Sequence, residues 1–175
     1  LTSLNVSGCT GLKTLDCGSA KISSINISGL MVLEELNCGN NILTTLDLSG
    51  HTTLKTLHCD NNQLTSLNVS ELRALEELHC GNNQLTVLST QNLTGLLKLN
   101  CYKNKLTALN LSTNAKLKSL SCDNNQLTSF DVSGTKALAE LRCGGNKLTA
   151  LDVGDLVLLE ELVCSSNQLA SLDVS

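Results

Sequence analysis

Nine cysteines and three histidines are the side chains of this 175-residue sequence that could bind a metal, form disulfides or act as nucleophiles. Only Cys9 lies outside a series with a constant step of 21 residues. That series consists of Cys17, Cys38, Cys59, Cys80, Cys101, Cys122, Cys143 and Cys164. The C-x-x-C and Cys/His spacings typical of zinc sites are absent. We therefore predict neither a metal site at the cysteines nor a cofactor.

Two of the histidines, His58 and His79, are also 21 residues apart. If the repeated units stack as neighbouring strands, these two rings would lie within about 5 Å of each other. With Asp60 and Glu77 they could form a metal or pH-sensitive site. Spacing fixes no third ligand, so we favour two exposed imidazoles side by side and assign no metal. Because the cysteines face the core and the histidines face away, we predict no catalytic pair and no enzyme.

The elements that position these side chains follow from an internal repeat. The unit reads L-x-x-L-x-C-x-x-N-x-L-T-x-L-D-V-S-x-x-x-x. After a partial repeat over residues 1–11, units begin at residues 12, 33, 54, 75, 96, 117, 138 and 159. We interpret residues 1–175 as a single leucine-rich repeat domain. Neither end carries a polar capping segment, so we expect a fragment of a longer chain.

The fold expected from this unit is a right-handed leucine-rich repeat solenoid. Its first half matches the signature L-x-x-L-x-L-x-x-N-x-L, with cysteine in place of the third leucine. The residues around L-x-C predict one short strand per unit, stacked into a parallel sheet on the concave side. The L-D-V-S stretch predicts an extended or irregular convex side. Little or no α-helix is expected, because 21 residues cannot also hold a long helix.

Two core columns recur with the leucines. We interpret the ladder cysteines as small buried hydrophobes, although disulfides between adjacent turns remain possible by distance. The second column is expected to satisfy backbone groups where the chain turns: Asn41, Asn62, Asn83, Asn104, Asn125, Asn146 and Asn167. Ala20 interrupts this column. Thr90 replaces a buried valine or leucine, which predicts a local distortion.

The joint recurrence of cysteine, asparagine and L-D-V-S resembles the internalin J-like family of bacterial surface leucine-rich repeat proteins, whose 21-residue repeats form a cysteine ladder. The resemblance covers essentially all 175 residues. It implies a secreted or cell-surface location outside the bacterial cell and a role in adhesion or virulence. These residues themselves contain no signal peptide.

The outward-facing residues of the sheet vary between units and form the predicted binding surface. Its candidate ligand-binding residues are His58, Asp60, His79, Asn100, Tyr102, Asp123 and Arg142. An acidic net charge of −4 disfavours nucleic acid or anionic lipid as partner. No apolar run is long enough to insert into a membrane. The leading hypothesis is a non-catalytic module that binds a protein or glycan; the alternative is a structural spacer that carries another functional domain. The oligomeric state is left open.

Overall fold

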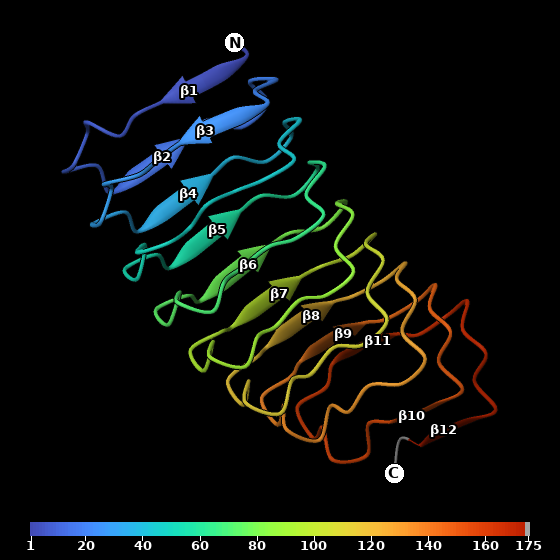
Figure 1. Cartoon of the computed structure of the whole chain (residues 1–175). Helices are drawn as coiled ribbons and strands as arrows, with labels where there is room; N and C mark the ends of the chain where they lie inside the picture. The colour runs from blue at the N-terminus through green and yellow to red at the C-terminus, as the bar shows by residue number, and fades with distance from the viewer. Residues whose placement is uncertain (174–175) are drawn as a thin grey trace.

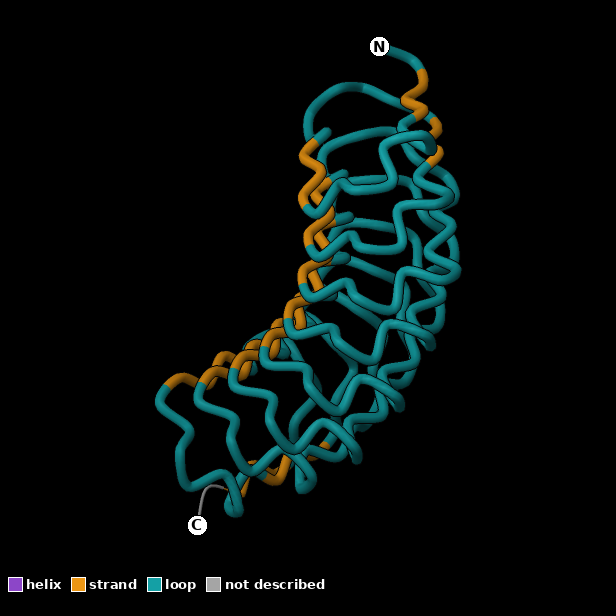
Figure 2. The backbone as a smooth tube through the Cα atoms, turned by 90° about the vertical axis from the view of Figure 1, so that its left-hand side faces the viewer, coloured by secondary structure: helices purple, strands orange, loops and turns teal. Residues whose placement is uncertain are grey.

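The computed structural model describes residues 1–173 as a curved parallel β-solenoid of short strands and turns (Figures 1 and 2). The strands are β1 Ser3–Asn5, β2 Thr14–Asp16, β3 Ser24–Asn26, β4 Glu35–Asn37, β5 Thr56–His58, β6 Glu77–His79, β7 Lys98–Asn100, β8 Ser119–Ser121, β9 Glu140–Arg142, β10 Ala150–Asp152, β11 Glu161–Val163 and β12 Ser171–Asp173. Among these residues there is no α-helix, and no helix is long and apolar enough to span a membrane. The leucine-rich repeat solenoid predicted from the repeat is thus confirmed.

An eight-stranded parallel sheet lines the concave side, in the order β11-β9-β8-β7-β6-β5-β4-β2. Each strand places its central leucine opposite the central leucine of the next, as in Leu57↔Leu78 and Leu78↔Leu99. The constant 21-residue step explains this register, because a shift by one residue would turn the buried leucines outward. The residues on either side of each leucine therefore face away from the core.

The convex side is mostly irregular, as predicted. Within residues 1–173 only two short parallel pairs form there, β1 with β3 and β10 with β12 (Figure 1). Between these pairs the L-D-V-S stretches form no strand, yet they bury every second side chain, as Leu67 and Val69 do. Alternating burial therefore persists where the strand hydrogen bonds are absent.

A ladder of buried asparagine side chains connects each turn with the one before it. In one unit the Nδ2 of Asn104 donates to the carbonyl oxygens of Cys101 and of Cys80 in the preceding turn, each at 3.1 Å. The Oδ1 of Asn104 accepts the N–H of Leu85 at 2.9 Å. The whole predicted column, from Asn41 to Asn167, makes the equivalent bonds. Each amide thus supplies partners to backbone groups that the turn leaves unpaired.

The residue before each of these asparagines has a positive φ. This column is Asn40, Asn61, Asn82, Lys103, Asn124, Gly145 and Ser166, and Ser19, which precedes Ala20, also has a positive φ. Asparagine and glycine tolerate the left-handed region better than other residues, which accounts for the Asn-Asn pairs of the repeat. Lys103, with φ of 48°, is the departure of greatest interest, because a long side chain in this region is strained.

The ladder cysteines are free thiols. The six interior members, Cys38, Cys59, Cys80, Cys101, Cys122 and Cys143, are completely buried. Burial raises the pKa of Cys101 to about 12, and the nearby Asp123 carboxylate adds to that effect. Cys17 and Cys164 are a correction to the expected uniform burial: both are half-buried, because they follow the edge strands β2 and β11.

The distortion predicted at Thr90 is absent, and the bends and turns of its unit follow those of the preceding unit. A buried polar pair explains this. The Thr90 hydroxyl lies 2.8 Å from the Oδ1 of Asn114 and 2.9 Å from the carbonyl oxygen of Asn110. The Nδ2 of Asn114 donates to the carbonyl oxygens of Thr90 and Leu93 at 3.2 and 2.9 Å. Two polar substitutions in neighbouring turns thus satisfy each other.

This pair leads to a prediction about stability. Thr90→Val alone should lower the free energy of unfolding by about 1–2 kcal/mol, because the buried Asn114 amide oxygen loses its partner. Adding Asn114→Leu should restore at least the original value, since the double variant copies the Val69 and Leu93 pair of the preceding turn. Urea denaturation followed by circular dichroism measures both changes. If the double variant lost as much unfolding free energy as Thr90→Val and Asn114→Leu lose separately, added together, the two residues would not be coupled.

Candidate functional site

The concave sheet carries all seven of the predicted site residues. His58, His79, Asn100 and Arg142 occupy the last positions of β5, β6, β7 and β9. Asp60, Tyr102 and Asp123 follow their strands by two residues and lie in the adjoining column. The strands β5 to β9 are consecutive neighbours in the sheet (Figure 1), so these side chains form one continuous strip of surface.

The two histidines lie closer together than two independent surface rings. His58 and His79 are direct cross-strand partners, and their ring centroids are 4.4 Å apart. The Nε2 of His79 lies 3.9 Å from the Oε2 of Glu77, two residues earlier on the same face of β6. Partial burial lowers the pKa of His79, and the neighbouring His58 lowers it further. The expected exposed pair is therefore a half-buried cluster that also includes a carboxylate.

Tyr102 is half-buried rather than exposed, which corrects the sequence expectation. Its ring lies across Gly81 of the preceding turn, where an added Cβ would come within 2.2 Å of the ring carbons. Glycine at position 81 therefore provides the space that the ring occupies. The Nζ of Lys103 lies 5.9 Å from the ring centroid, within the range of a cation–π contact. Ring and ammonium together form an aromatic and cationic feature in the strip.

Two of the other predicted residues are engaged by neighbouring turns. The Asp123 carboxylate accepts hydrogen bonds from the Ser121 hydroxyl at 3.0 Å and from the Gly144 N–H at 2.9 Å. Arg142 forms an ion pair with Glu161 of β11. These contacts brace the C-terminal half of the strip. A ligand would therefore have to compete for Arg142.

A hollow that the sequence did not predict lies at the N-terminal end of the same sheet. It is lined by Thr14, Leu15, Asp16, Glu35, Leu36, Asn37, Thr56 and His58, from β2, β4 and β5. His58 thus connects the predicted strip with this hollow. The outward-facing columns could be identified from the sequence. Whether a hollow forms between them depends on the sizes of neighbouring side chains, which the repeat does not specify.

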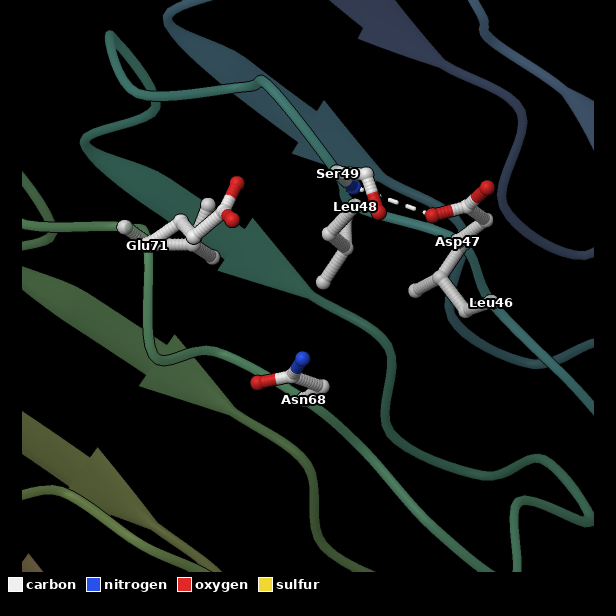
Figure 3. A pocket seen from close by; sticks show the side chains of 7 residues that line it. Leu46, Asp47, Leu48, Ser49, Asn68 and Glu71 are labelled. Carbon is white, nitrogen blue, oxygen red and sulfur yellow. Dashed lines mark hydrogen bonds between the residues drawn. The ribbon is translucent and has the colours of Figure 1, made fainter.

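A second hollow, on the outer side of the solenoid, fits a ligand poorly (Figure 3). Its lining includes Asp47, whose Oδ1 accepts the N–H of Ser49 at 3.0 Å, and Glu71, whose Oε2 accepts the N–H of Gly50 at 3.1 Å. The hollow encloses about 70 Å³, far below the roughly 300 Å³ at which small-molecule pockets begin. Its carboxylates therefore accept backbone N–H groups, Asp47 within its own turn and Glu71 from the preceding turn.

Charged side chains also cross between turns near the sheet. Glu34 lies between Lys13 and Lys55, with contacts of 3.1 and 2.7 Å. Hydrogen bonds from Lys55 and Lys13 lower the pKa of the Glu34 carboxyl. Lysine and glutamate thus alternate over three successive turns and contact one another, although exposed pairs of this kind stabilise only weakly.

Comparison with known proteins agrees with this geometry. Residues 52–90 match the family described as "Leucine Rich repeats (2 copies)". No curated protein matches the chain. The fold and the family match define a leucine-rich repeat domain.

Solved structures specify the type of repeat. The functional domain of InlJ (internalin J) from Listeria monocytogenes, which includes a cysteine ladder, is 40% identical with a TM-score of 0.97; the match covers 99% of this chain and 39% of that one. A leucine-rich repeat protein of Leptospira interrogans is 28% identical with a TM-score of 0.89, covering 94% of this chain and 46% of that one. The present chain is an internalin J-like leucine-rich repeat domain with a cysteine ladder.

A more distant structure shares only the fold. The ectodomain of the plant membrane receptor kinase GASSHO1/SCHENGEN3 from Arabidopsis thaliana, in complex with Casparian strip integrity factor 2, is 23% identical with a TM-score of 0.77; the match covers 94% of this chain and 25% of that one. The present chain spans less than half the length of each of these three structures. Leucine-rich repeat domains of this kind are typically non-catalytic.

Proposed function

We propose that this domain is a binding module of a bacterial secreted or cell-surface protein, which recognises a protein or glycan through its concave sheet in adhesion or virulence. The similarity to internalin J supports the bacterial surface location. The plant ectodomain in complex with its factor shows that this fold can present a binding surface. The shape supports the choice of face, since the concave sheet offers outward side chains on a rigid, curved support.

The observation that carries the proposal is the arrangement at Tyr102. Its ring lies over Gly81, and Lys103 beside it adopts a strained positive φ. Neither residue is the usual choice at its position, where other units have Gly, Asp or Ser and then mostly Asn or Ser. Neither substitution is required by the core, because both side chains face away from it. A tyrosine side chain has only two rotatable χ angles, so it loses little entropy on binding and is a common interface anchor.

Tyr102→Ala should therefore weaken binding to the natural partner by roughly 1 kcal/mol or more, while the fold stays intact. The measurement is a binding titration against a panel of host-surface proteins and glycans. Thr107→Ala and Asp131→Asn are matched controls, because both residues are exposed and lie away from the concave sheet. If only the control variants lost binding affinity, the binding site would lie on the outer side. Equal loss from both sets, or no loss from any variant, would favour the spacer.

A further inference from the structure

The side chains of His58, Glu77 and His79 converge on one point of the concave sheet. The register pairs His58 with His79, and Glu77 lies on the same face as His79 because the two are two residues apart in β6. One donor atom from each of the three residues lies within 4.8 Å of the other two. We propose that these residues bind a divalent first-row transition-metal ion of the Zn²⁺ class. The site departs from the sequence expectation, because strand register supplies the third ligand that spacing alone did not fix.

The donor set selects the class of metal. Two imidazole nitrogens and one carboxylate oxygen suit zinc and its neighbours, whereas calcium and magnesium prefer sets made of oxygen. Donors bound to one zinc ion at about 2.1 Å are separated by about 3.4 Å in a tetrahedral arrangement. The present separations require side-chain rotations only, since the strands already place all three residues on one face. Three protein ligands leave a coordination position open for water or a partner.

The ring nitrogens at this point lack other partners. In the described part of the chain, the Nε2 atoms of His58 and His79 are both buried and neither has a hydrogen-bond partner. Buried polar atoms in folded proteins are normally paired, so two adjacent exceptions require an explanation. A metal ion bound at these nitrogens provides one. His51 shows the contrast: its two ring nitrogens lie 3.1 Å from the carbonyl oxygens of Ser49 and Ile27.

Neighbouring charged side chains have opposite effects on the binding of a cation. The neutral imidazole is the form that binds metal, and partial burial lowers the pKa of His79 in the direction that favours this form. The Lys98 ammonium lies 3.5 Å from the Oε1 of Glu77 and opposes a bound cation. The Asp60 carboxylate lies near enough to counteract part of this repulsion. Removing the Lys98 charge should therefore strengthen binding, which no purely structural role of the histidines would predict.

The test uses the 175-residue chain with Cys9→Ser, which removes the exposed thiol. Zinc sulfate is added at pH 7.5 and the three histidine rings are observed by ¹H–¹⁵N NMR. We expect one equivalent of zinc to shift the ring nitrogens of His58 and His79 and to leave those of His51 unchanged. This result does not depend on any partner, so it remains distinguishable from the outcome for the proposed function.

Calorimetry of variants assigns the ligands. His58→Ala, His79→Ala and Glu77→Gln should each weaken zinc binding by at least about 10-fold, and Lys98→Gln should strengthen it. Glu76→Gln is the matched control, because it removes the same charge one residue away and outside the donor set; it should change affinity little. Circular dichroism checks that each variant remains folded. The proposal would be overturned if zinc shifted the NMR signals of neither His58 nor His79, or of all three histidines alike. It would also be overturned if His58→Ala and His79→Ala bound zinc as tightly as the parent chain.

Discussion

Asn104→Ala is expected to lower the free energy of unfolding by about 2–4 kcal/mol. The substitution leaves the buried N–H of Leu85 without its acceptor, the Oδ1 of Asn104. It also removes one of the two amide donors that reach each of the carbonyl oxygens of Cys80 and Cys101. A buried donor without a partner costs about 1–3 kcal/mol, and the two weakened acceptors add to this. Urea denaturation followed by circular dichroism measures the loss.

Two further variants separate hydrogen bonding from volume. Asn104→Asp keeps the shape of the side chain but replaces the donating Nδ2 with an oxygen that faces two carbonyl oxygens, so its loss should be at least as large as that of alanine. Asn110→Ala is the control, because this exposed asparagine in the same unit only accepts the N–H of Ser112; the loss should stay below about 1 kcal/mol. If Asn104→Ala and Asn110→Ala lowered the free energy of unfolding equally, the asparagine ladder would contribute no more stability than an exposed turn asparagine.

The column of asparagines could be predicted from the sequence because a buried position repeated at a fixed step meets the same environment in every turn. The strand register follows in the same way, as Leu57, Leu78 and Leu99 show. The positive φ of Asn61 and its equivalents was not predicted. The Asn-Asn pair was a usable signal, because asparagine is enriched in the left-handed region.

The departures from the repeat could not be derived in the same way. Thr90 was visible as an exception, but its partner Asn114 lies 24 residues away, in the next turn. The position of Tyr102 over Gly81 depends on a side-chain conformation at the surface, where no core packing selects one rotamer. The contact of Glu77 with the histidines required the face of each strand and its register together. Sequence periodicity thus predicts the environment that all turns share, but not the contacts of a residue that departs from the repeat.

The cysteine ladder has a structural explanation that joins side chain and backbone. Each interior cysteine donates its N–H to the next turn, as Cys80 does to the carbonyl oxygen of Asn100 at 2.8 Å. Its carbonyl oxygen accepts from two ladder asparagines, as that of Cys80 does from Asn83 and Asn104. The side chain at this crowded position must be apolar and small, and a thiol satisfies both conditions. The same burial that favours the thiol also suppresses its reactivity.

Thiol labelling in the native state is therefore expected to separate Cys9 from the six interior cysteines by about three orders of magnitude in rate. A pKa of about 12 at Cys101 leaves roughly one thiol in ten thousand ionised at pH 8, against about one in ten at the ordinary value near 9. Only the thiolate attacks the reagent, and burial further limits access. Interior labelling should thus follow local opening of the solenoid and rise to the rate of a free thiol in urea.

Mass spectrometry of tryptic peptides after timed exposure to iodoacetamide resolves the individual sites. Cys9, which is exposed, should react first, and Cys9→Ser should remove that phase. The half-buried Cys17 and Cys164 should react at intermediate rates, because each follows an edge strand, which has a neighbouring strand on one side only. Labelling should therefore be slowest at the centre of the ladder and fastest at its ends. Interior cysteines that react as fast as Cys9 in the folded chain would show that the ladder opens freely, and burial would then no longer explain why a thiol is tolerated at these positions.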